Sequence, residues 1–153
     1  MQIASKKAFT MVELVFVIVV IGILSAIAIP KLAATRDDAT ITKAIATIGA
    51  VRSAIATERQ KRILRGDFTA IGDLALNGGA STPIFDFFDG NNTLQVLEYP
   101  IRSCASGSNG CWVRTNATTY TYSMPTSGTV TFTLNNNRFD CPSSDANCQL
   151  LTK

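Results

Sequence analysis

The sequence contains no histidine, and only 16% of its 153 residues are charged. Without histidine, Ser-His-Asp and Cys-His catalysis, histidine-ligated metal sites and acid–base chemistry by imidazole are excluded. The 14 basic and 11 acidic side chains nearly balance, and a protein that binds polyanions through a basic surface carries a larger excess. No nucleophile elbow, phosphate-binding loop or paired-carboxylate site is evident. The sequence therefore predicts a protein that is not an enzyme and needs no cofactor.

What the sequence does have is a long apolar run, in which 17 of the 21 residues of Phe9–Ile29 are apolar. As an α-helix this run would span ~31 Å, about the hydrocarbon thickness of a membrane. A buried core helix of so small a domain would not need that length. A membrane helix and a cleaved secretory signal both stay open, because Lys6 and Lys7 precede the run and Ser25–Ala28 has the small residues of a signal peptidase site.

One carboxylate, Glu13, lies within this apolar run. An unpaired carboxylate costs ~2.5–3.5 kcal/mol at the centre of a membrane helix and less near its end, so a partner is expected. If the chain were cut just before Phe9, a new α-amino group would lie at the head of the same helix. The Glu13 carboxylate of one chain could then neutralise the amine of a staggered neighbour, and the low dielectric would make that pairing selective. This predicts ordered lateral assembly.

The segment from Lys6 to Leu14, KKAFTMVEL, closely resembles the N-terminus of type IV prepilins, which pilins and pseudopilins share. The apolar run that follows and the closing Pro30 belong to the same resemblance, which covers roughly residues 6–31, about a sixth of the chain. In this family a prepilin peptidase removes a short basic leader on the cytoplasmic side of the membrane and methylates the new amine.

The resemblance implies a role for three residues. The scissile bond would join Ala8 to Phe9, Phe9 would carry the N-methyl group, and Glu13 would align neighbouring subunits. The family usually has glycine before the cut, and Ala8 is the nearest substitute in size. Cleavage before Phe9 is therefore expected.

The resemblance also implies a domain organisation: a leader over residues 1–8, a transmembrane and assembly helix over 9–30, and an extracytoplasmic globular domain over 31–153. The chain would cross the inner membrane once before assembly and lie in a periplasmic or cell-surface filament afterwards. Its expected partners are identical or related pilin subunits, the prepilin peptidase, the membrane and the inner-membrane assembly platform.

The expected function is that of a structural filament subunit, a pseudopilin or minor pilin. Such a filament would serve type II secretion, adhesion and motility, or DNA uptake. The alternative is a membrane-anchored extracytoplasmic binding module that does not polymerise.

A helical pattern continues beyond Pro30. Apolar residues recur at spacings of 3, 4, 3 and 4 along one face, namely Ile41, Ala44, Ile48, Val51 and Ile55. Arginines in the last turn and Gly66 directly after it predict where the helix ends. One long helix with a kink at Gly22 or Pro30, and two helices separated at Pro30, both fit this pattern.

The C-terminal half changes to a period of two. Residues 66–100 carry the Gly and Asn clusters of loops, with room for one short helix. Alternation then predicts a hairpin and two flanking strands, at residues 119–124, 129–134, 111–114 and 138–140. The predicted fold class is α+β, a long N-terminal helix packed on a small antiparallel sheet of three or four strands, as in pilins.

The four cysteines fall into two equally spaced pairs, Cys104 with Cys111 and Cys141 with Cys148. An even count in an exported domain indicates disulfides. Pairing within each short loop is preferred, because the Gly, Ser and Asn residues between the cysteines allow tight closure. The alternatives are the other two connectivities and a zinc site, whose usual ligand spacing is shorter.

Two further clusters invite functional interpretations. Asp86–Asn92 has carboxylate and amide oxygens near a glycine, but it departs from the EF-hand calcium pattern, so a turn is preferred and no metal site is predicted. The basic cluster of Arg59, Lys61, Arg62 and Arg65 could contact DNA. A solvated helix end whose charges complement the helix dipole is the preferred interpretation of this cluster.

Overall fold

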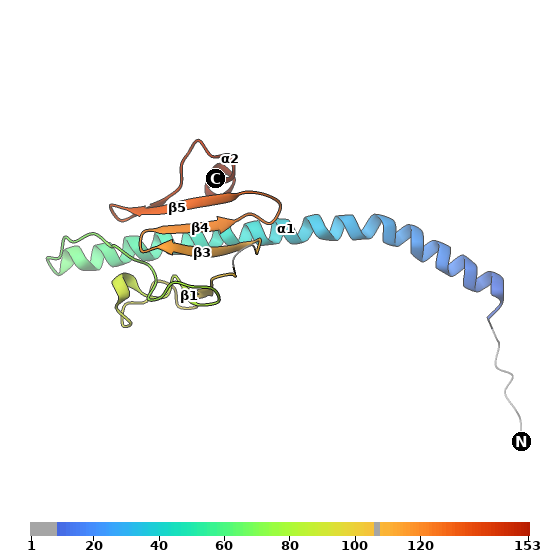
Figure 1. The fold of residues 1–153 in the computed structure, drawn as a ribbon, viewed down its shortest axis with the longest axis horizontal. Helices are drawn as coiled ribbons and strands as arrows, with labels where there is room; N and C mark the ends of the chain where they lie inside the picture. The colour runs from blue at the N-terminus through green and yellow to red at the C-terminus, as the bar shows by residue number, and fades with distance from the viewer. Residues whose placement is uncertain (1–8, 106–107) are drawn as a thin grey trace, which may run out of the picture. The chain divides into compact units, whose positions relative to one another are not determined.

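The computed structural model describes residues 9–105 and 108–153. They fall into two compact units, one ending at Arg36 and the other comprising Asp37–Lys153. The elements, shown in Figure 1, are in chain order α1 (Met11–Leu64), β1 (Pro83–Ile84), the 3₁₀ helix η1 (Phe88–Gly90), β2 (Ile101–Arg102), β3 (Cys111–Asn116), β4 (Thr119–Ser123), β5 (Thr129–Asn135), β6 (Arg138–Asp140) and α2 (Ala146–Thr152).

α1 is a single helix with Pro30 inside it, so of the two arrangements that the sequence left open, the structure has the continuous one. The helix ends where Gly66 was expected to stop it. Gly66 has a positive φ of 79°, its N–H bonds to the carbonyl of Ile63, and the N–H of Asp67 bonds to the carbonyl of Arg62. This is a Schellman motif, in which glycine adopts the left-handed conformation without steric cost.

The predicted antiparallel sheet is confirmed, with four strands in the order β3-β4-β5-β6. Tyr120 pairs with Phe132 and Tyr122 with Val130 across the central hairpin, which places these apolar residues on one face. Gly128, at φ 88°, closes the turn between β4 and β5, and the N–H of Met124 bonds to its carbonyl. The polar residues that alternate with them on β5, such as Thr131, are exposed.

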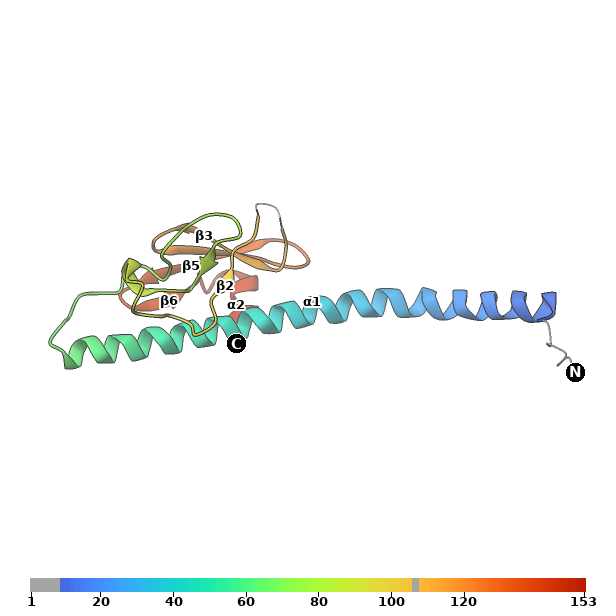
Figure 2. The ribbon, with the colours of Figure 1, turned by 90° about the horizontal axis from the view of Figure 1, so that it is seen from below.

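The core of the second unit lies between this sheet and the part of α1 that belongs to the same unit (Figure 2). The helical face predicted from sequence is buried at Ala44, Ile48, Val51 and Ile55, and Ile41 is partly buried against the same core. The sheet and the turn after β4 contribute six buried side chains, Tyr120, Tyr122, Met124, Val130, Phe132 and Leu134. The aromatic residues among them are therefore core residues, and the α+β class is confirmed.

Three small elements were not expected from the sequence. β1 and β2 form a separate two-stranded sheet, and each has only two residues, too few to show a period. α2 begins inside the second cysteine loop, which was expected to be irregular. Asp145 caps α2 by accepting a hydrogen bond from the backbone N–H of Asn147 at 2.9 Å.

Candidate assembly site at the head of the first helix

The head of α1 is organised by a reciprocal pair of hydrogen bonds between Thr10 and Glu13. The hydroxyl oxygen of Thr10 accepts the backbone N–H of Glu13 at 3.2 Å, and Oε2 of Glu13 accepts the backbone N–H of Thr10 at 3.2 Å. The Thr10 hydroxyl also donates to Oε2 at 3.1 Å. This is a capping box, with Thr10 at the N-cap and Glu13 three residues on, and it satisfies two backbone donors that have no partner within the helix.

The cap occupies one of the two carboxylate oxygens of Glu13. Within the described part of the chain, Oε1 of Glu13 has no hydrogen-bond or ion-pair partner. The side chain of Phe9, one residue before the cap, is 80% exposed. Glu13 can therefore cap its own helix end and still offer an oxygen to a cation. Ala8, the other half of the predicted scissile bond, lies outside the described residues.

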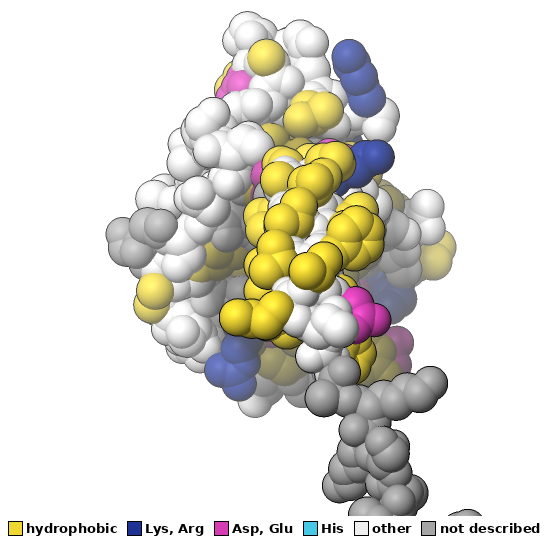
Figure 3. Space-filling view, turned by 90° about the vertical axis from the view of Figure 1, so that its right-hand side faces the viewer, with side chains coloured by type: hydrophobic (Ala, Val, Ile, Leu, Met, Phe, Trp, Pro, Cys, Tyr) yellow, Lys and Arg dark blue, Asp and Glu magenta, His cyan; other side chains and the backbone are white. Residues whose placement is uncertain are grey.

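The turns of α1 that follow present apolar side chains all round the helix. Every large hydrophobic residue from Met11 to Ile29 is exposed, with Phe16, for example, 68% accessible. Figure 3 shows such side chains gathered over the end of the molecule that faces the viewer. Among the described residues, α1 is the single helix long and apolar enough to cross a membrane. A surface of this kind requires lipid or other apolar helices to cover it.

The predicted kink positions lie in this same segment. Pro30 is inside the helix, where it removes one backbone hydrogen bond. A Cβ added at Gly22 would meet nothing within 4 Å, so this glycine is not required by packing within one chain. A kink at either residue stays a prediction.

The N-terminal sequence matches known proteins over this same region. A family model for the prokaryotic N-terminal methylation motif matches residues 3–29. The type IV narrow pilus major component PilA5 of Thermus thermophilus is 51% identical over 59 residues, which cover 37% of this chain. The N-terminal region of the chain is therefore similar to that of type IV pilins.

The likeness is confined to part of each chain. The aligned region spans about half of the relative's length, 51%. No solved structure matches the chain.

The domain of the pilin-like chain carries two disulfides, Cys104–Cys111 and Cys141–Cys148. This is the pairing preferred from the short loops between the cysteines, and it leaves no free cysteine among the described residues. Cys148 is 3% exposed and belongs to the core, whereas Cys104, Cys111 and Cys141 are partly exposed.

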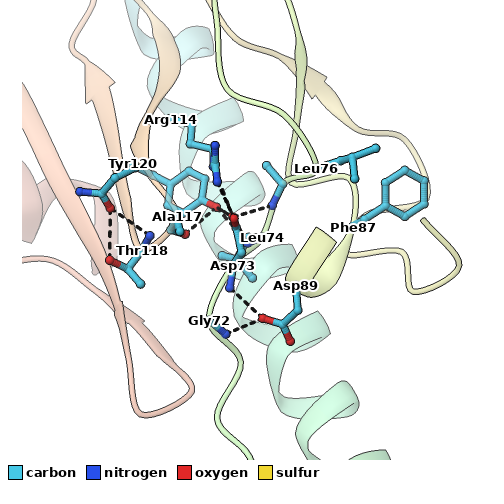
Figure 4. A network of polar contacts seen from close by, with 12 residues as sticks. Gly72, Asp73, Leu74, Leu76, Phe87, Asp89, Arg114, Ala117, Thr118 and Tyr120 are labelled. Atoms are coloured by element: carbon cyan, nitrogen blue, oxygen red, sulfur yellow. Dashed lines mark hydrogen bonds and ion pairs between the residues drawn. The ribbon is translucent and has the colours of Figure 1, made fainter. Parts of the chain in front are cut away.

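Carboxylates in and next to η1 accept hydrogen bonds from backbone N–H groups, and we call this network the acidic clamp (Figure 4). Oδ1 of Asp89 accepts the backbone N–H groups of Gly72 and Asp73 at 2.6 and 3.0 Å. Oδ1 of the buried Asp86 accepts those of Leu76 and Phe87 at 2.9 and 3.0 Å. These carboxylates fix the long loop against the domain, and the described residues contain no group of three or more acids or cysteines that could hold a metal ion.

A third carboxylate, Asp73, completes the clamp. It forms an ion pair with Arg114 and accepts the hydroxyl of Tyr120 at 2.9 Å. Burial and the nearby charge of Asp73 raise the pKa of Tyr120 far above its usual value. The pKa of Arg114 is also raised, because the hydrogen bond and charge of Asp73 outweigh the opposing effect of burial.

The basic cluster at the end of α1 is not an uninterrupted surface patch. Arg62 is 7% exposed and pairs with Glu58 at 3.1 Å and with Asp89 at 2.6 Å. These partners raise its pKa, although burial alone would lower it. Arg59 donates to the carbonyl of Thr69 at 3.0 Å. Two of the four cations are thus engaged within the domain, which weakens the case for DNA contact there.

The feature that sequence reasoning missed is the cap. The pattern Thr10-Met-Val-Glu13 is the Thr-x-x-Glu signature of a capping box, directly before an apolar run. This spacing is visible in the sequence, but the charge of Glu13 in an apolar run drew attention to a partner on another chain instead. The acidic clamp carried no comparable signal, because its residues are brought together from three separate segments by folding.

Proposed function

We propose that this chain is a structural subunit of a type IV pilus-like filament. The observation that carries the proposal is the exposed apolar surface from Met11 to Ile29 with Glu13 at its head. Before assembly, lipid would cover this surface, with residues 9–30 spanning the membrane once. In the filament, the same segments of neighbouring subunits would cover one another. The methylation motif and the pilus component from Thermus thermophilus support this function.

Maturation would create the charge that Glu13 needs. A prepilin peptidase removes the leader, residues 1–8, by cutting between Ala8 and Phe9, and the new amine of Phe9 is methylated. Methylation keeps the amine cationic while making it less hydrated. The mature helix then begins with a cation and, four residues on, a carboxylate.

Assembly would use the oxygen that the cap leaves open. Oε2 of Glu13 stays with Thr10, and Oε1 accepts the methylated amine of Phe9 from a neighbouring subunit. In the low-dielectric helix bundle an uncompensated charge is costly, so this pairing sets the axial stagger between subunits. The apolar surface supplies contact area, and the ion pair supplies register.

The filament would lie in the periplasm or at the cell surface, after subunits leave the inner membrane through an assembly platform. Type II secretion, adhesion or motility, and DNA uptake are all compatible with a small disulfide-bonded domain on a filament. In each case the role is structural rather than catalytic. The exposed residues of the domain would form the filament surface.

The competing function is a membrane-anchored module that never polymerises. A matched set of three variants separates the two. Glu13→Gln retains a side chain that can complete a capping box but removes the charge. Thr10→Ala removes the cap but keeps the charge. Glu13→Val removes both.

The proposal predicts that Glu13→Gln and Glu13→Val abolish incorporation into filaments, whereas Thr10→Ala retains most of it. Incorporation is measured by recovery of the chain in sheared filament fractions, against total chain in the membrane. Normal incorporation of Glu13→Gln would refute a role for the charge in assembly. If Thr10→Ala lost incorporation to the same extent, the role of Glu13 would be to cap its own helix rather than to pair with a neighbouring subunit.

A further inference from the structure

A cleft of about 350 Å³ lies within the globular unit, between α1 and the beginning of β3. Its residues come from four elements: Lys43 and Thr47 from α1, Ile101 and Arg102 from β2, Trp112 from β3 and Tyr122 from β4. The volume is at the lower end of the range for small-molecule sites, and it suits a ligand with a single ring.

The charges on this cleft are of one sign. Lys43 and Arg102 line it, and no carboxylate belongs to its described lining. The ammonium group of Lys43 has no hydrogen-bond or ion-pair partner among the described residues, and the guanidinium group of Arg102 donates one bond, to the carbonyl of Ser81 at 3.1 Å. Most donors of the two cations are therefore available to a ligand.

Two other clefts of the globular unit include carboxylates in their lining. One is lined by Glu58 and Lys61, and Glu58 pairs with Arg62. Another contains Arg52 and Arg138, both of which pair with Asp140, at 2.9 and 3.1 Å. By contrast, neither Lys43 nor Arg102 has a carboxylate partner in the part of the chain that the structure describes. The cleft that they line can therefore accept an anion.

The walls of the cleft combine apolar and hydroxyl groups. Trp112 and Ile101 supply apolar surface, and Thr47 and Tyr122 bring hydroxyl oxygens. The Tyr122 hydroxyl donates to the carbonyl of Thr40 at 3.2 Å, so its oxygen remains able to accept a hydrogen bond. Such a mixture of aromatic surface and a few polar groups is typical of sites for small ring-shaped ligands.

The wall at the beginning of β3 is held in place by its neighbours. Gly110 bonds to the carbonyl of Ser123 at 2.8 Å, and the Cys104–Cys111 disulfide ties the adjoining loop. A Cβ at Gly110 would lie 2.6 Å from Cγ2 of Thr40, so this backbone passes directly against α1. A cleft bounded in this way is formed before a ligand arrives, which lowers the cost of binding.

We infer that this cleft binds a small organic anion, a sugar acid of one ring, whose carboxylate is held by Lys43 and Arg102. Guanidinium and ammonium donors make strong charge-assisted hydrogen bonds to a carboxylate. The ring would lie against Trp112, with its hydroxyls toward Thr47 and Tyr122. The inference does not depend on filament assembly, because every group it uses belongs to one chain.

Trp112 is the single tryptophan of the sequence, so its fluorescence reports on the cleft directly. The full chain in detergent micelles is titrated with glucuronate at constant ionic strength, with glucose and with inorganic phosphate in parallel. Isothermal titration calorimetry measures the same binding without relying on fluorescence. We expect a saturable signal with glucuronate and none with glucose, while phosphate binds at least tenfold more weakly.

Lys43→Gln and Arg102→Gln should each weaken glucuronate binding about tenfold, the loss expected when a hydrogen bond to a charged group is removed. Lys61→Gln, a change at a lysine of the same helix outside the cleft, should bind like the unmodified chain. Unchanged thermal unfolding of the variants excludes misfolding as the cause. The inference is overturned if neither method detects glucuronate, if glucose or phosphate binds equally well, or if the two cleft variants bind normally.

Discussion

Tyr120 joins β4 to the loop after α1 through its hydroxyl group. Its oxygen accepts the backbone N–H of Leu74 at 2.9 Å and donates to Oδ1 of Asp73 at 2.9 Å, while its ring is fully buried beside Phe85. Ionised tyrosine would place a second negative charge beside Asp73 inside the domain. Burial first, and this charge second, therefore raise its pKa.

The raised pKa of Tyr120 predicts that the domain loses stability as the pH rises into the alkaline range. In the unfolded chain Tyr120 ionises near pH 10, whereas the folded chain retains the proton to higher pH. The contribution of Tyr120 to the free energy of unfolding is therefore complete below about pH 10. Above that pH it falls by up to about 1.4 kcal/mol per pH unit. Urea unfolding of the full chain in detergent between pH 8 and pH 11 measures the slope.

Tyr120→Phe is the variant that isolates this effect. It should cost about 1 kcal/mol at pH 8 through the lost hydrogen bonds, and its stability should fall less steeply above pH 10. Burial also raises the pKa of Tyr122, so the stability of Tyr120→Phe should still fall to some extent above pH 10. Tyr122→Phe is the comparison variant. Parallel pH profiles for Tyr120→Phe and the unmodified chain would contradict the role assigned to this hydroxyl.

Glu13 shows both the reach and the limit of sequence reasoning at a single residue. The cost of a carboxylate in an apolar run predicted that it must have a partner, and the structure contains one, Thr10, within its own helix end. The apolar context indicated that a partner was needed but not which one. Spacing along the chain would have identified Thr10, whereas a partner on another chain requires the assembled filament.

At the scale of elements, the C-terminal end of α1 depends on a cluster of charges that the helical pattern does not reveal. Glu58 and Arg62 are 4% and 7% exposed, and Arg62 also pairs with Asp89 of η1. The cluster connects α1 to the acidic clamp. Glu58 and Arg62 are one turn apart on the helix, whereas Asp89 is 27 positions beyond Arg62 in the sequence.

Arg62→Met should destabilise the domain by about 3–5 kcal/mol, because it leaves the carboxylate of Glu58 buried without its cation. The double variant Glu58→Met/Arg62→Met should recover most of that loss, since it removes both charges together. In either variant Asp89 still accepts hydrogen bonds from the backbone N–H groups of Gly72 and Asp73. Chemical denaturation of the full chain in detergent measures the three free energies. A double variant no more stable than Arg62→Met would contradict this account of the cluster.

The elements that the sequence predicted are those long enough to show a repeating pattern of apolar residues. The spacing from Ile41 to Ile55 identified the buried face of α1, and alternation identified the hairpin of β4 and β5. The sequence did not predict β1, β2 and α2, because strands of two residues and a helix of seven are too short to show a period. They form where tertiary contacts, such as the pairing of Ile84 with Ile101, outweigh weak local preference.

At the scale of the whole molecule, the domain is held by two short disulfide loops in addition to its core. Each loop joins cysteines seven residues apart. The Cys141–Cys148 bond links β6 to α2 and reaches the core through Cys148. The Cys104–Cys111 bond closes a loop beside the cleft lined by Lys43 and Arg102.

Replacing either cysteine pair by serine should lower the free energy of unfolding by about 2–3 kcal/mol on the chain-entropy model. The Cys141→Ser/Cys148→Ser variant should lose more than the Cys104→Ser/Cys111→Ser variant, because it also places a hydroxyl in the core. Unfolding of the full chains in detergent without reductant provides the comparison. Equal stability of both variants and the unmodified chain would show that the loops close without help from the bonds.

The sequence predicted the fold class, the main sheet and the helical core face, and its composition and resemblance indicated the apolar segment that we propose for assembly. It could not predict the acidic clamp or the cleft, because each is assembled from residues that become neighbours through folding. Asp73 and Tyr120, for example, are 47 positions apart. The acidic clamp and the cleft are thus the parts of the molecule least accessible from sequence.

We propose above all that a chain matured at Phe9 enters a filament. Mass spectrometry of the N-terminal peptide, taken from this chain in filaments sheared from cells, tests this most directly. We expect a peptide that begins with N-methylated Phe9, with residues 1–8 absent. Filaments without this chain, or a chain that begins at Met1 or after the apolar run, would contradict it.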